Sequence, residues 1–246
     1  MDIFRFKIFE KYPELVHGVS TAEIGDMSFL HGEPNIVKES RKKFFDILGI
    51  TPEKITGLSL MHGTKIFDIE RSEGNVMEPI DKDADILFTD KPETYLFFII
   101  ADCLGIFIYD PVKKVVSITH AGWRGVNKEA PKVTIQHYIE KYGSDPNDLI
   151  VGFSPAIQKE SMNFLHTNDL TNEAWPKYIK ENGNNTKQID WIKFAYDQIV
   201  GEGVLPENIE ISDINTRTDK NFFSHRESVE DHLPERRFGC LIGYKN

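Results

Sequence analysis

The feature of the sequence that most constrains the fold is the run from residue 95 to residue 125, "YLFFIIADCLGIFIYDPVKKVVSITHAGWRG". Two stretches rich in aromatic and β-branched residues flank a short polar segment with an Asp-Pro pair, a pattern typical of two strands joined by a hairpin turn. A turn of two or four residues predicts a register in which Cys103 lies opposite His120, with Cβ atoms about 4.5–5.5 Å apart. The polar residues at the two ends of the hairpin are therefore expected to meet.

The rest of the chain mixes strand patterns and helix patterns. Apolar residues recur at helical spacing in three segments that end at glycines, which are residues 35–50, 127–144 and 190–204. Strand patterns occupy residues 1–18, 56–70 (two short strands around His62-Gly63), 84–90, 148–157, 208–216 and 236–244.

The polar stretch 159–187 has weak periodicity and is predicted to be partly loop. Strands and helices do not alternate strictly, and no Gly/Ser/Pro-rich linker divides the sequence. We therefore expect a single α+β domain over residues 1–246, with mixed or antiparallel β-sheets flanked by helices.

Composition excludes several classes of protein. With 40% hydrophobic residues the chain is not disordered, and its formal net charge of −10 argues against general binding to nucleic acid or an anionic membrane. The most apolar run is interrupted by Asp102 and Gly105 and is too short to span a bilayer. The first residues lack the apolar centre of a signal peptide. A cytoplasmic protein is the expectation, with a small anionic substrate still compatible; the sequence does not predict an oligomeric state.

The chain has two cysteines, and a disulfide is not expected between them. Cys240 is predicted to be a small buried residue on the terminal strand. The Cys103–His120 pair admits three interpretations, namely simple packing, a Cys/His nucleophile pair and a metal site. His62 before Gly63 adds a third ligand, and a His/Cys/His set leaves the fourth position of a tetrahedral metal open, as in catalytic sites.

Five histidines outside the motifs have no cluster of potential metal-binding or catalytic residues around them in the sequence. They are predicted to pack in the interior or to face solvent; they are His17, His31, His137, His166 and His232.

Four motifs, in the order "HG" at residue 62, "ADILFTD", "ADCLGIFIYD" and "THAGWRG", make the chain similar to the YfiH family. This family is also called the laccase-domain or multicopper polyphenol oxidase family, and the resemblance covers nearly the whole chain. It implies a CNF1/YfiH-like fold and a zinc ion bound by His62, Cys103 and His120.

The resemblance also implies an activity on purine nucleosides. The expected reaction is phosphorolysis of adenosine, inosine, guanosine or methylthioadenosine, with phosphate as the second substrate and adenosine deamination as a further activity. An older assignment of the family, copper-dependent oxidation of phenols, is less favoured. One Cys and two His cannot supply the ligands of a coupled multicopper centre.

The sequence departs from the family pattern around the expected pocket. Ala22 stands where the family commonly has Arg, and Leu60 where it usually has Gln. Residues Gln158 to Phe164 replace a Gly-Pro-Cys-Cys-Tyr-Glu motif, and the terminal Ser-Tyr-Arg-Arg is reduced to Ser224-His225-Arg226-Glu227. A diverged, non-catalytic zinc-binding protein is therefore the alternative to an active enzyme.

Two further residues are candidates for catalytic roles. Asp102, beside Cys103, would serve in acid–base chemistry or orient a ligand histidine, or else it is a carboxylate hydrogen-bonded at a strand bend. Arg124 would clamp phosphate with its planar guanidinium, close to the start of a helix expected near Asn127, or it would form a structural salt bridge.

Overall fold

The computed structural model describes residues 3–164, 169–182 and 186–246. The larger of its two main sheets is made of β13 (Ile209–Ile211), β9 (Ile150–Phe153), β7 (Leu104–Asp110), β8 (Val115–Ala121), β5 (Ile86–Thr89) and β4 (Ile66–Asp68), in that spatial order. The other main sheet is made of β1 (Ile3–Phe4), β2 (Leu15–Ser20), β14 (Phe238–Tyr244), β6 (Tyr95–Ile100) and β3 (Ile55–Gly57). Both sheets mix parallel and antiparallel pairs, which confirms the predicted α+β class.

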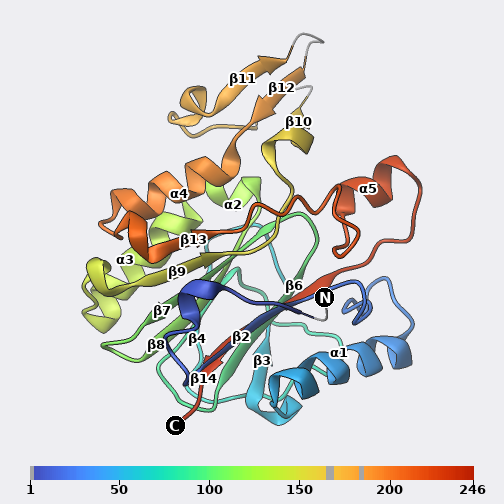
Figure 1. The fold of residues 1–246 in the computed structure, drawn as a ribbon, viewed down its shortest axis with the longest axis vertical. Helices are drawn as coiled ribbons and strands as arrows, with labels where there is room; N and C mark the ends of the chain where they lie inside the picture. The colour runs from blue at the N-terminus through green and yellow to red at the C-terminus, as the bar shows by residue number, and fades with distance from the viewer. Residues whose placement is uncertain (1–2, 165–168, 183–185) are drawn as a thin grey trace.

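Helices cover the outer faces of the two sheets, which pack against each other (Figure 1). Helix α1 (Pro34–Leu48) covers the five-stranded sheet. The helices on the six-stranded sheet are α2 (Trp123–Asn127), α3 (Ala130–Tyr142) and α4 (Trp191–Gly201).

Strand β7 shows how alternation builds these layers. Ile106 and Ile108 pack toward the helices, whereas Phe107 and Tyr109 pack toward the five-stranded sheet. Both faces of the strand are therefore buried, and its sequence reads as a continuous apolar run.

The predicted helices are present, with one correction. α1 and α3 both end at glycines in the left-handed conformation, Gly49 and Gly143, as expected from the sequence. The helix expected to begin near Asn127 is divided into α2 and α3 by Glu129, which has a φ of 63°. Helix α2 follows the end of β8 directly, with Gly122 as its N-cap.

The hairpin is also present, but the predicted register is wrong. Gly105, and not Cys103, lies opposite His120, and Asp110 pairs with Val115. Asp110 is the last residue of β7, and its Oδ1 accepts hydrogen bonds from the backbone N–H groups of Val112 and Lys113 in the turn, both at 2.8 Å. Cys103 lies at the bend before β7, where Asp102 has a φ of 73°.

The stretch predicted as partly loop contains a small third sheet, at the top of Figure 1. Its strands are β10 (Asn163–Phe164), β12 (Thr186–Ile189) and β11 (Ile179–Asn182). Residues 165–168 and 183–185, and with them His166, lie outside the described residues. Within the described residues, none of the helices has the length and apolar character needed to cross a membrane.

Helix α5 (His225–Glu230) was not expected from the sequence. Its N-cap is Ser224, whose side chain accepts a hydrogen bond from the backbone N–H of Glu227. The Ser-x-x-Glu spacing is a helix-start signal that would have predicted it. Both cysteines are free, and Cys240 is buried on β14 as predicted.

The predicted packing role of His17 is confirmed, and it has a consequence for stability. His17 lies on β2 with an exposed fraction of 5%, and its Nε2 accepts a hydrogen bond of 3.0 Å from the Phe6 backbone N–H. Burial, helped by the charge of Arg5, lowers the pKa of His17 to about 3. The imidazole is therefore neutral in the folded protein at every ordinary pH.

This histidine is expected to make the fold acid-sensitive. Below pH about 6.5 the unfolded chain binds a proton at His17 that the folded chain does not bind until pH about 3, so stability falls as pH drops through this window. Between pH 7.5 and pH 5 the loss is about 2 kcal/mol. Urea unfolding of the wild type and His17→Gln at both pH values measures it. Equal losses in the two proteins would contradict the assignment.

Candidate metal centre

Three side chains that the sequence analysis singled out as metal ligands lie together in the structure. The ligand atoms of His62, Cys103 and His120 are all within 4.8 Å of one another. Cys103 Sγ is 4.0 Å from His62 Nε2, and the two imidazole rings meet edge to face with centroids 4.7 Å apart. The three residues come from the loop between β3 and β4, the bend before β7 and the end of β8.

A buried aspartate, Asp85, organises two of these three residues. Its Oδ1 accepts hydrogen bonds from the backbone N–H groups of Met61 (3.1 Å) and His62 (2.8 Å), and its Oδ2 accepts one from Gly63 (2.8 Å). His62 has a φ of 58°, and such left-handed residues turn successive N–H groups toward one anion. One carboxylate thus fixes the loop that carries the first histidine.

Asp85 also fixes the third ligand. His120 Nδ1 lies 2.8 Å from Asp85 Oδ1, and the His120 backbone N–H donates to the Asp85 carbonyl at 2.7 Å. Because a carboxylate accepts hydrogen bonds, Nδ1 carries the proton and Nε2 is left with its lone pair for a metal ion. Metal-binding histidines usually have such a carboxylate partner.

The electrostatics of the site favour a thiolate. Burial raises the pKa of the Cys103 thiol, but the hydrogen bonds and charges of His120 and His62 outweigh it and bring the pKa to about 6. Burial lowers the pKa of His120, whereas its contacts with Asp85 and Cys103 outweigh burial and raise this pKa above its usual value. A metal ion that binds Nε2 takes the place of any proton held there. The thiolate is the form of cysteine that binds metal ions.

The space beside these ligands depends on Gly122. A Cβ atom at this position would lie 2.9 Å from Cys103 Sγ, 3.1 Å from His62 Cδ2 and 3.7 Å from His120 Nε2. Any larger residue would therefore fill the space between the three ligands. Two imidazoles and a thiolate held in this way fit a metal ion with N and S ligands.

Asp102 directly precedes the candidate ligand Cys103, but the hydrogen bonds of its carboxylate are made with other residues. It is buried; its Oδ1 accepts a hydrogen bond from Thr216 Oγ1 (2.7 Å), and its Oδ2 accepts from Ser224 Oγ (2.9 Å) and the Arg226 backbone N–H (2.7 Å). The carboxylate in contact with a ligand histidine is that of Asp85. Asp102 instead joins the bend that carries Cys103 to the start of α5.

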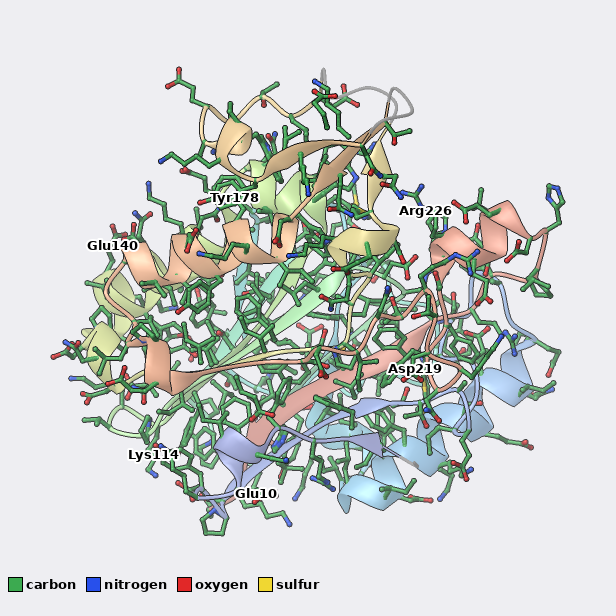
Figure 2. All side chains as sticks on the ribbon, turned by 45° about the horizontal axis from the view of Figure 1, so that its top comes forward. Glu10, Lys114, Glu140, Tyr178, Asp219 and Arg226 are labelled. Atoms are coloured by element: carbon green, nitrogen blue, oxygen red, sulfur yellow. The ribbon has the colours of Figure 1, made fainter. Side chains whose placement is uncertain are left out.

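Arg124 lies on the exposed side of α2, where its guanidinium stacks over the Trp123 ring at 4.2 Å. Within the described residues it has no carboxylate partner, so the alternative of a structural salt bridge finds no support. Arg226 lies on α5 at the edge of the molecule (Figure 2), and its side chain is 3.7 Å from Glu230. Neither arginine lines the cavity described next.

A cavity of approximately 630 Å³ opens from the three ligands. Its apolar walls include Leu58, Ile80 and residues 97–101 of β6 and the bend after it. Leu60, which departs from the family pattern, lines the cavity, whereas Ala22 packs against the core between the two main sheets. A volume of this order is typical of sites for small organic ligands.

Sequence reasoning missed Asp85 as a functional residue. The signal that could have found it is an acidic residue placed directly before a fully buried, mostly apolar strand, inside the "ADILFTD" motif. A charged group at such a position is buried by the fold and needs several donors.

Comparisons with known proteins identify the family of this chain. A family model described as multi-copper polyphenol oxidoreductase laccase matches residues 16–242. Purine nucleoside phosphorylase YlmD of Bacillus subtilis is 29% identical over 169 residues, which are 67% of this chain and 60% of that protein. Purine nucleoside phosphorylase LACC1 of Mus musculus is 25% identical over 85% of this chain and 47% of its own length. The chain thus spans about half to three-fifths of the length of these relatives.

A solved structure shows the same fold. YlmD from Geobacillus stearothermophilus has a TM-score of 0.89 at 21% identity and covers 100% of this chain and 97% of its own. The region matched by the family model includes all three candidate ligands and most strands of both main sheets. The chain therefore belongs to the multi-copper polyphenol oxidoreductase laccase family, which confirms the family predicted from its motifs.

Proposed function

We propose that this protein is a zinc-dependent purine nucleoside phosphorylase. The observation that carries the proposal is the His62, Cys103 and His120 cluster at the end of a cavity large enough for a nucleoside. Relatives named purine nucleoside phosphorylase support the reaction, with a purine nucleoside and phosphate as substrates. The expectations of a cytoplasmic location and a single domain over residues 1–246 belong to the same proposal.

The metal would be held by Nε2 of both histidines and by Sγ of Cys103. Three N and S ligands with an open fourth position suit zinc, which when bound would act as a Lewis acid toward an oxygen of a substrate or water. Asp85 holds the proton on Nδ1 of His120 and so presents Nε2 to the site. Gly122 keeps the space in front of the ligands open.

The two remaining candidates receive separate roles in the proposal. The three donors around the Asp102 carboxylate support a positioning role, in which it holds the Cys103 bend against α5. Arg124, two residues after Gly122, remains a predicted contact for phosphate on the outer side of the ligands.

Oxidation of phenols by coupled copper ions is the competing proposal. The described part of the chain holds one cluster of three potential ligands, whereas coupled copper centres need histidines around several ions. The ligand set therefore supports a site for one metal ion.

Elemental analysis and product analysis of one preparation test the proposal. We expect about one zinc per chain and release of free base from inosine, adenosine or methylthioadenosine only when phosphate is present. Ammonia release from adenosine without phosphate would identify a deaminase instead. Oxygen uptake with a phenol, in proportion to bound copper, would identify an oxidase. Zinc without any turnover would contradict an enzymatic function.

A further inference from the structure

The cavity at the metal centre has an unusual charge for this protein. The chain as a whole has 39 acidic and 29 basic residues. The described residues that line the cavity include no Asp or Glu, and its basic residues besides the two ligand histidines are His31, Arg41, His225 and Arg237. A cavity of this composition attracts anions, although the protein's net charge repels them.

Three of these basic side chains converge on one carboxylate, that of Glu235. Arg237 Nη2 is 2.6 Å, His225 Nδ1 3.1 Å and His31 Nε2 3.6 Å from Glu235 Oε2. The hydrogen bond from Arg237, followed by one with His225 and by their charges, lowers the pKa of Glu235. One guanidinium and two imidazoles, from three separate segments, thus already surround one anionic oxygen at the cavity wall.

The backbone of Arg237 is fixed, so its side chain has a defined position. Its N–H donates to Asp26 Oδ1 at 2.9 Å, and its carbonyl accepts from the Met27 N–H at 3.0 Å. The exposed fraction of its side chain is only 19%. A fixed and mostly buried guanidinium loses little freedom when it binds an oxyanion.

The fourth basic residue, Arg41 of α1, is only 2% exposed. Among the described residues, no carboxylate forms an ion pair with its guanidinium. Its guanidinium donates to the backbone carbonyls of Met27 and Val76. Burial lowers its pKa to about 10, a reduction that the charge of Asp26 opposes, so it stays charged at neutral pH. Buried charges are normally paired, and here the wall of the cavity keeps a positive charge that no contacting acid neutralises.

We propose that the cavity binds a purine nucleoside that carries a phosphoryl group, with the phosphoryl group held by Arg237, His225 and His31. The apolar walls would take the purine, and Glu235 would yield its place among the three basic side chains to the phosphoryl oxygens. This proposal rests on the proposed function for the purine and goes beyond it in the charge of the ligand. The same three side chains would also bind free phosphate, so the test distinguishes a phosphorylated nucleoside from inorganic phosphate.

Calorimetry distinguishes these ligands when the zinc-loaded protein is titrated separately with adenosine 5′-monophosphate, adenosine and inorganic phosphate. We expect the monophosphate to bind at least about tenfold more tightly than adenosine, as charge-assisted hydrogen bonds to phosphate provide. Arg237→Gln should remove most of this preference, so that the affinity for the monophosphate falls much further than the affinity for adenosine. Arg236→Gln is the matched control, because this neighbouring arginine is exposed, stacks over Phe223 and does not line the cavity.

A second variant, Glu235→Gln, removes the internal anion without removing a cation. We expect it to raise the affinity for the monophosphate severalfold, and a fall in that affinity would contradict displacement of Glu235. Equal affinities for adenosine and its monophosphate, with phosphate binding that depends on Arg237, would overturn the proposal in favour of a free-phosphate site. Because binding is measured without turnover, nucleoside phosphorolysis with no preference for the monophosphate would refute this inference alone.

Discussion

Replacing Cys103 by alanine is expected to remove the bound zinc and to lower nucleoside phosphorolysis by about 10³-fold or more. The thiolate is one of three ligands within 4.8 Å of one another, and two imidazoles alone hold zinc weakly. Elemental analysis of the purified variant and its rate of base release from inosine measure the two effects.

The second cysteine provides the matched control for this experiment. Cys240 is fully buried on β14 and packs in the core between the two main sheets, away from the ligand set. Cys240→Ala should keep one zinc per chain while losing about 1 kcal/mol of stability from the missing sulfur atom. If Cys103→Ala keeps its zinc, or loses zinc but no activity, the proposed zinc enzyme is refuted.

Local patterns were sufficient to predict most elements of the fold. The helix ends at Gly49 and Gly143 follow from a backbone conformation that only glycine adopts easily. The hairpin was predicted from its apolar strands and its turn residues, but its register was not. Register depended on the Asp110 carboxylate, which caps the turn from inside the strand, and the sequence pattern does not show where that side chain points.

The candidate ligands could be predicted because they occur in short motifs, whereas the residues that hold them could not. Asp85 contacts the loop 61–63, which lies 22 to 24 positions earlier in the sequence, and His120, which lies 35 positions later. The partners of Asp102 lie between residues 216 and 226, which is 114 to 124 positions later in the sequence. Contacts of this range depend on the complete tertiary structure, and no local pattern encodes them.

Asp85 and Asp102 are both buried and hydrogen-bonded, but they differ in the residues that their carboxylates contact. Each carboxylate accepts at least three hydrogen bonds, and each lies close in sequence or space to a candidate ligand. Asp85 contacts the imidazole of His120 directly, whereas the partners of Asp102 are hydroxyls and an amide outside the ligand set. Substituting each of them by asparagine therefore separates orientation of the metal ligand from support of the fold.

Asp85→Asn is expected to weaken zinc binding by about 10–100-fold, because the amide can no longer accept from His120 and from the three loop N–H groups together. Asp102→Asn should leave zinc affinity within about twofold and lower the free energy of unfolding by about 2 kcal/mol, since one of its donors loses its acceptor. Competition with a chelator of known affinity gives the first quantity, and urea unfolding of the metal-free proteins gives the second. Equal zinc affinities in the two variants would show that the contact between Asp85 and His120 does not orient the ligand, and that the loop and the imidazole are held in place by packing alone.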